Sequence, residues 1–217
     1  SWRICCLGQN WQFASMVRCR AGPPMLPEPI AVALHVIDAL EHVGARYAIG
    51  GSLASAIHGV VRTTLDADIL ADLRLEQAES FVELLGASFY LDLDTVRAAI
   101  RQRSSFNAIH LATMFKVDIF IPKLRPFDAS QLDRRQAWVA DPTSGRSVYV
   151  TSAEDIVLAK LAWYRLGDGV SDRQWRDVLG VLAVQAGRLD LAYMRREATT
   201  LGVGDLLARA LDDAPAV

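Results

Sequence analysis

The stretch Gly50-Gly51-Ser52-Leu53-Ala54-Ser55-Ala56-Ile57-His58-Gly59-Val60-Val61-Arg62-Thr63-Thr64-Leu65-Asp66-Ala67-Asp68 decides how this 217-residue chain is interpreted. Its glycine pair follows an apolar segment, residues 47–49, that is typical of a short buried strand, and precedes a helical pattern over residues 53–58. Two glycines allow a polyanion to approach the backbone closely, and the start of a helix offers free amides and the positive end of a dipole. The same turn also fits a plain connector, so by itself it does not establish a site.

Three aspartates follow this turn on two predicted strands. Asp66 and Asp68 begin a strand over residues 66–70, and residues i and i+2 of a strand point to the same face. Neighbouring carboxylates repel each other unless a cation lies between them, and hard oxygen ligands suit Mg²⁺. Asp118 is the only acid in the apolar strand predicted over residues 115–121, where a carboxylate without a partner is costly to bury. A solvated sheet edge is the alternative explanation, but the first strand continues with apolar residues and is therefore predicted to be buried.

The rest of the chain predicts an α+β fold. A proline cluster ends an irregular N-terminal extension, residues 1–29, and the last stretch, residues 151–217, is helical throughout. Between them, residues 30–150 alternate helices with short strands, which predicts a mixed β-sheet flanked by helices and followed by a C-terminal helical subdomain. The predicted helices cover 30–43, 53–58, 75–85, 94–103, 153–166, 172–185, 189–201 and 203–211, and the predicted strands cover 47–49, 66–70, 106–111, 115–121 and 148–150.

Helix starts and one hairpin can also be predicted. Thr151 with Glu154 and Ser171 with Gln174 each have the spacing of a capping box, which begins a helix. The strands 106–111 and 115–121 are joined by so short a link that they are predicted to be antiparallel neighbours.

Charge and cysteine content restrict the class of protein. The formal net charge of −2 gives no overall attraction for nucleic acid or for an acidic membrane. Residues 97–146 nevertheless carry nine Lys or Arg against four acids, which favours a polyanionic acceptor or, as charge runs commonly do, forms a solvated face. The three cysteines all lie in the first 19 residues and form no disulfide framework, and no apolar run approaches the roughly 18 residues of a membrane span. These features predict a cytoplasmic protein that does not enter a membrane.

With these motifs in place, the chain resembles the DNA polymerase β-type nucleotidyltransferase superfamily. The resemblance rests on Gly50-Gly51-Ser52, the Asp66-Ala67-Asp68 segment and the later Asp118, and it covers about residues 46–121. The run from Arg62 through Asp68 (Arg-x-Thr-x-Asp-x-Asp) is most similar to minimal nucleotidyltransferases of the abortive-infection (AbiEii-like) toxin group.

The resemblance implies a role for each matching residue. Gly50, Gly51 and Ser52 hold the triphosphate of an NTP. Asp66, Asp68 and Asp118 hold two Mg²⁺ ions, and Asp118 also helps to deprotonate the acceptor hydroxyl.

Three further side chains are considered, and two of them have alternative roles. Arg62 either contacts phosphate, as the toxin-like pattern implies, or pairs with a carboxylate to orient its loop. Lys160 lies inside an apolar helical stripe, from which it either reaches the triphosphate, as a lysine does in related toxins, or extends to the surface. Trp163 has the spacing of a core residue.

The predicted function is therefore transfer of a nucleoside monophosphate from an NTP to the hydroxyl of a tRNA, a protein or a small molecule, with Mg²⁺ as cofactor and release of pyrophosphate. The toxin-like motif adds the prediction that the protein is the toxin of a toxin–antitoxin pair, with an antitoxin protein as partner. The alternative is a non-catalytic module that uses the same fold to bind a nucleotide or a partner.

Overall fold

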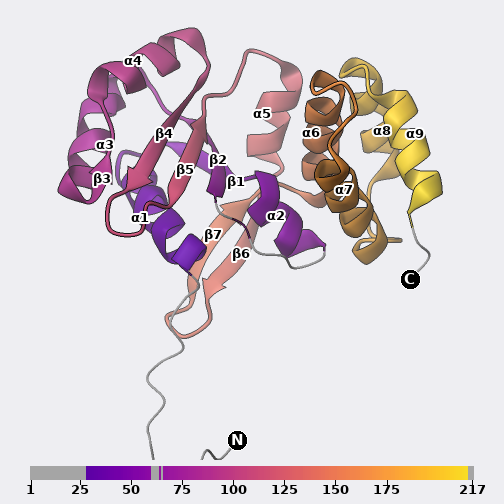
Figure 1. Ribbon diagram of the computed structural model, residues 1–217, viewed down its shortest axis with the longest axis horizontal. Coiled ribbons are helices and arrows are strands. Elements are labelled where there is room, and N and C mark those ends of the chain that lie inside the picture. The colour runs from indigo at the N-terminus through magenta and orange to yellow at the C-terminus, as the bar shows by residue number, and fades with distance from the viewer. Residues whose placement is uncertain (1–27, 60–63, 65, 215–217) are drawn as a thin grey trace, which may run out of the picture.

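The computed structural model describes residues 28–59, 64 and 66–214 (Figure 1). Residues 1–27 of the predicted extension lie outside this part, whereas Glu28 and Pro29 begin the first helix. The helices are α1 (Glu28–His42), α2 (Gly51–His58), α3 (Ala78–Leu85), α4 (Leu93–Gln102), α5 (Pro126–Asp133), α6 (Ala153–Leu166), α7 (Asp172–Val184), α8 (Leu191–Thr200) and α9 (Gly204–Asp213), with short 3₁₀ turns at Leu75–Gln77 and Gly86–Ser88. The strands are β1 (Arg46–Ile49), β2 (Asp66–Asp72), β3 (Phe89–Tyr90), β4 (Ser105–His110), β5 (Lys116–Phe120), β6 (Gln136–Asp141) and β7 (Arg146–Val150).

The described strands form one mixed sheet in the order β3-β4-β5-β2-β1-β7-β6. β2 and β5 are parallel, as are β1 and β7, and every other neighbouring pair is antiparallel. The predicted α+β class, with a mixed sheet and helices, is therefore confirmed, and so is the antiparallel pairing of β4 with β5.

The pleat of β2 separates the core from the site. Ala67, Ile69 and Ala71 are fully buried and point to one face, while the acidic residues of the strand alternate with them and point to the other. Helix α1 packs against β1, β2 and β5 and contributes Val36 and Ile37 to the same hydrophobic core. α3 packs against α1 and α4, and α4 packs against β4, so these helices extend the layer that α1 begins.

Helices α6 to α9 gather on one side of the molecule, away from α3 and α4 (Figure 1). α6 and α7 pack against α2 as well as against each other, so the helical tail is joined to the sheet through the helix that follows Gly50. None of the helices in the described ranges is both long and apolar enough to cross a membrane.

The helix starts of this tail were predicted with one error. Ser171 caps α7 by accepting a hydrogen bond from the amide of Gln174, as the capping box predicts. The cap of α6, however, is Ser152, whose hydroxyl accepts from the amide of Asp155. Thr151 instead donates its hydroxyl to the carbonyl of Ile49 on β1, which ties the start of the tail to the sheet.

Three elements were not predicted from the sequence. β3 has only two residues, too few for a recognisable period. α5 starts with Pro126 at its first position and has apolar residues spread around the helix, so no amphipathic stripe marks it. β6 is an edge strand in which only Ala140 is buried, and it therefore lacks the alternation that indicates a half-buried strand.

Candidate active site

The carboxylates of Asp66, Asp68 and Asp118 lie on one face of the sheet. β2 and β5 are parallel neighbours in which Asp68 is paired with Asp118 and Asp66 with Lys116. Because residues two apart on a strand share a face, this register places the three aspartates and Lys116 side by side on the face opposite the core. The sequence predicted both the common face of Asp66 and Asp68 and the adjacency of Asp118.

The three acids interact unfavourably with one another. The pKa of Asp68 is raised to about 6, by burial first and then by the neighbouring charges of Asp66 and Asp118, whereas Lys160 and a hydrogen bond from the backbone amide of Ser52 act in the opposite direction. Burial and like charges both disfavour the ionised carboxyl, so a cation bound here would relieve the two largest unfavourable effects together. Oxygen donors of this kind suit Mg²⁺.

Each of the other two aspartates has a neutralising or donating partner. The carboxylate of Asp118 forms an ion pair with the ammonium of Lys116, whose Nζ lies 2.7 Å from Oδ2. This contact raises the pKa of Lys116, and the nearby Asp66 and Asp68 add to the effect. Asp66 accepts a hydrogen bond from the hydroxyl of Thr64, 2.9 Å from Oδ1. The partner that Asp118 was expected to need is thus Lys116, a partly exposed residue of its own strand.

The metal site expected from the sequence is not assembled in the described part of the chain. There, no three Asp, Glu, His or Cys side chains stand close enough together to hold a metal ion. The donor chemistry nevertheless fits Mg²⁺, because three carboxylates from adjacent strands face the same space.

The Gly50-Gly51-Ser52 turn joins β1 to α2 and packs directly on Asp68. The backbone of Gly50 donates to the carbonyl of Asp68 at 2.8 Å, and the amide of Ser52 donates to its carboxylate. Gly51 has a φ of +53°, and a Cβ added there would lie on the Asp68 carboxylate. Glycine at this position is therefore required both by the backbone conformation and by the close approach of the acid.

A cleft of about 540 Å³ opens in front of these residues. Its floor is formed by the turn at Gly50 and by Asp66 and Asp68, and its walls come from the end of β5, from α5 and from α6 and α7. The predicted triphosphate-binding residues Gly50, Gly51 and Ser52 and the predicted carboxylates Asp66 and Asp68 thus line a single cavity.

Lys160 lies in the cleft, but it does not extend to the surface. Only 6% of the residue is exposed, and Nζ lies 2.9 Å from Oδ2 of Asp177 on α7. Of the two predicted orientations, the one toward the surface is therefore wrong. The lysine instead links α6 to α7 through this ion pair, and its positive charge acts to lower the pKa of Asp68.

Two further cleft residues were missed or misassigned. Arg173 on α7 lines the cleft, and its guanidinium lies 3.5 Å from the Ser52 hydroxyl, so a cation stands next to the predicted phosphate site. Trp163 was assigned to the core, but it is 55% exposed and forms part of the cleft wall, with an edge-on contact to Phe120. The position of Arg173 beside the predicted helix start at Ser171 could have indicated it as a site residue. The helical spacing of Trp163, in contrast, does not distinguish a core residue from one in the wall of a cavity.

Arg62, the remaining predicted site residue, lies outside the described residues.

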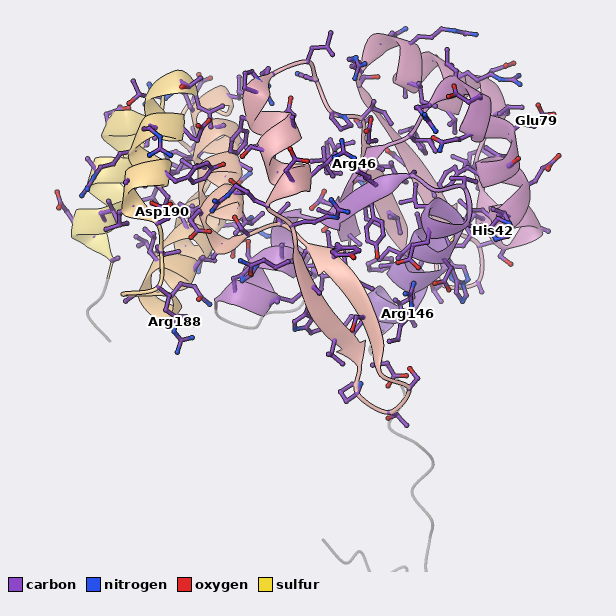
Figure 2. The ribbon with its side chains drawn as sticks, turned by 180° about the vertical axis from the view of Figure 1, so that it is seen from behind. His42, Arg46, Glu79, Arg146, Arg188 and Asp190 are labelled. Atoms are coloured by element: carbon purple, nitrogen blue, oxygen red, sulfur yellow. The ribbon has the colours of Figure 1, made fainter. Side chains whose placement is uncertain are left out.

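The basic stretch predicted over residues 97–146 is largely neutralised in the folded chain. Five of its nine cations pair with carboxylates: Arg97 with Glu79, Lys116 with Asp118, Arg125 with Asp128, Arg134 with Glu154, and Arg146 with Asp38 and Glu41. Figure 2, which shows the molecule from behind, labels Arg146 on the β6–β7 hairpin. Its ion pairs tie the hairpin to α1.

The sheet order, the helix after β1 and the acidic face of β2 and β5 together define a nucleotidyltransferase fold. The model is similar to a crystal structure of ANT(2'')-Ia in complex with adenylyl-2''-tobramycin, with a TM-score of 0.53 and 16% identity over 79% of this chain and 97% of that chain. It is also similar to a solution structure of the antibiotic-resistance factor ANT(2'')-Ia, with a TM-score of 0.50 and 17% identity over 83% of this chain and 91% of that chain. A putative nucleotidyltransferase from Thermotoga maritima aligns with a TM-score of 0.46 and 20% identity over 70% of this chain and 96% of that chain. No protein-family model and no curated protein sequence matches the chain.

Proposed function

We propose that this protein is a Mg²⁺-dependent nucleotidyltransferase that transfers a nucleoside monophosphate from an NTP to an acceptor hydroxyl and releases pyrophosphate. The observation that supports this most strongly is the convergence of Asp66, Asp68 and Asp118 on one sheet face beside the Gly50-Gly51-Ser52 turn. Bound Mg²⁺ would neutralise the phosphates and stabilise the attacking and leaving oxygens.

The chain's own residues supply the rest of the chemistry. The Ser52 amide and hydroxyl, with Arg173 beside them, bind the triphosphate at the start of α2. Asp66 and Asp68 would hold the cation that accompanies the NTP, and Asp118 would hold a second ion on the acceptor side. The acceptor oxygen attacks the α-phosphorus as the bond to the β-phosphate oxygen breaks, and Asp118 takes the hydroxyl proton.

Lys160 is proposed to act from the wall of the cleft. Its ion pair with Asp177 fixes the ammonium between α6 and α7, where its charge stabilises both Asp68 and an approaching phosphate. Arg62, which the motif also connects with phosphate, completes the proposed nucleotide-binding set.

The acceptor is open among tRNA, protein and small molecule, and the structure favours the last. The neutralised basic stretch removes the main argument for a polyanionic acceptor, and the exposed Trp163 together with Leu166 gives the cleft an apolar wall. The crystallised neighbour ANT(2'')-Ia was bound to an adenylylated small molecule, adenylyl-2''-tobramycin. A toxin role with a cognate antitoxin rests on the Arg62-to-Asp68 motif alone, and a cytoplasmic location is proposed because NTPs are supplied there.

The proposal is tested by incubating the protein with each α-labelled NTP and Mg²⁺ against tRNA, total protein and a small-molecule extract. We expect label in one acceptor fraction with wild-type protein and none with Asp66→Asn. If the wild type bound NTP but labelled no fraction, the non-catalytic nucleotide-binding module would be the better explanation.

A further inference from the structure

The side chain of Lys116 lies where the acceptor-side cation of the proposed reaction has to bind. Its ammonium is 2.7 Å from Oδ2 of Asp118, and Asp118 is the one proposed cation ligand on β5. The side chain of Asp118 is 15% exposed and that of Lys116 is 41% exposed. The more exposed lysine therefore covers the carboxylate on its solvent side.

The register of the sheet determines which groups surround Lys116. On the β2 side its direct neighbour is Asp66, and on the β4 side its neighbour is the apolar Ile109. The ammonium therefore has acids on one side only, and it is directed toward the carboxylate cluster rather than away from it. Lysine carries a full positive charge at neutral pH.

A metal ion and an ammonium cannot share one carboxylate oxygen at contact distance, because two cations this close repel each other strongly. The two proposed cation positions therefore differ in whether a side-chain cation already contacts their carboxylate ligand. Asp66 is hydrogen-bonded to Thr64 and Asp68 to the Ser52 amide, so no side-chain cation in the described residues is shown in contact with either. Among the described residues, Asp118 is the one of the three aspartates that forms an ion pair with a side-chain cation.

We propose that Lys116 competes with the acceptor-side Mg²⁺ for Asp118, so that the second ion enters the site after the NTP-bound ion and only when the ammonium moves off the carboxylate. This inference rests on the proposed function. It makes Lys116 a positioning residue that orders assembly of the site: the pair holds the Asp118 side chain in place until the nucleotide arrives, and it prevents the acceptor side from holding a metal beforehand.

The test counts Mn²⁺ ions by electron paramagnetic resonance in the presence of the α,β-methylene analogue of each NTP, which binds but cannot transfer. Wild type is expected to bind one Mn²⁺ tightly and a second about 10-fold or more weakly. Lys116→Met is expected to tighten the weak site by about the same factor and to leave the strong one unchanged. Lys116→Arg, which keeps the charge, should behave as wild type, and so should Arg101→Met, which removes a charge from the exposed end of α4.

Circular dichroism verifies that each variant is folded. Two equally tight ions in wild type, or an unchanged weak site in a folded Lys116→Met, would overturn the competition while leaving the proposed nucleotidyltransferase intact. Absence of nucleotide-dependent Mn²⁺ binding from both wild type and Lys116→Met would contradict the proposed function itself, and the inference with it.

Discussion

Two regions of the molecule bury acids, and they do so in opposite ways. At the carboxylate face of β2 and β5, Asp68 is half-buried beside two like charges, and its pKa rises to about 6. Where α5, α6 and α8 meet, Asp155 is fully buried, and burial raises its pKa as well, but there the hydrogen bonds of Tyr193 and Ser152 and the charge of Arg134 oppose the shift. Like charges surround Asp68, whereas Asp155 accepts the Tyr193 hydroxyl at Oδ1 and has the Arg134 guanidinium near its other oxygen, with Nε 3.5 Å from Oδ2.

The second region shows what a paired buried acid looks like. The Tyr193 hydroxyl donates to Oδ1 of Asp155 at 2.6 Å, and the Arg134 guanidinium stacks 3.9 Å from the centroid of the Tyr193 ring. Arg134 also pairs with Glu154, whose carboxylate accepts the amide of Asp190. The network joins three helices and lies outside the proposed chemistry, so its purpose is to fix the tail. The two regions thus differ in what surrounds the acid: like charges act on Asp68, whereas a hydroxyl donor and a cation act on Asp155.

Of the variants that compare the two regions, Asp68→Asn should have the largest effect. This change removes a proposed metal ligand while it keeps the shape of the side chain, so transfer should fall about 100- to 1,000-fold or more. Pyrophosphate release with an identified acceptor measures it. Asp155→Asn is the comparison from the other region: its effect should appear in stability, with turnover of the folded fraction preserved. Equal losses of turnover in the two variants would remove the distinction between the regions.

Gly51→Val should come next. The positive φ and the Asp68 carboxylate leave no room for a side chain, so the variant must displace the acid, and nucleotide affinity should fall about 10- to 100-fold. Isothermal titration with a non-hydrolysable NTP measures this. The matched control is Gly44→Ala, at a φ of +72° with open space around it. This change should lower the free energy of unfolding by about 1 kcal/mol and leave the nucleotide affinity unchanged. Unchanged affinity in a folded Gly51→Val would mean that the turn is only a connector.

The pH dependence of stability should report the like-charge repulsion around Asp68. Asp68 titrates at about 6 in the folded chain, which is above its ordinary value, so the folded state binds more protons between about pH 4 and pH 6. The free energy of unfolding should therefore fall as the pH rises through this window. Asp68→Asn should remove that loss, which is on the order of 2 kcal/mol, and should be more stable than wild type at pH 8. Urea denaturation of both proteins across this range provides the measurement, and parallel curves would contradict the repulsion described for the site.

Tyr193→Phe should give the smallest effect. It deletes the hydroxyl that donates to the buried Asp155 and should cost about 1–3 kcal/mol, with nucleotide affinity unchanged. Tyr149→Phe, at a 41% exposed tyrosine, is the control and should stay within about 0.5 kcal/mol of wild type. Thermal unfolding distinguishes the two, and equal melting temperatures would show that the network contributes little.

Local sequence patterns predicted much of the fold. α6 has the predicted bounds, and the face shared by Asp66 and Asp68 follows from the two-residue period of a strand. What could not be predicted depends on contacts across the chain. The partner of Lys160 comes from another helix, and the exposure of Trp163 depends on the cleft that forms in front of α6. Lys116 could have been found, because the same two-residue period places it on the face of Asp118, but the apolar character of the strand drew attention to the acid alone.

The central claim is that the three carboxylates form a catalytic site, and Asp118→Asn tests it most directly. The variant and wild type are compared by titration with a non-hydrolysable NTP and Mg²⁺, and by transfer of α-labelled NTP to the identified acceptor. Nucleotide affinity should be retained through Asp66, Asp68 and the Ser52 turn, while transfer should fall about 100- to 10,000-fold because the acceptor loses its base. Transfer at the wild-type rate by the folded variant would contradict the account.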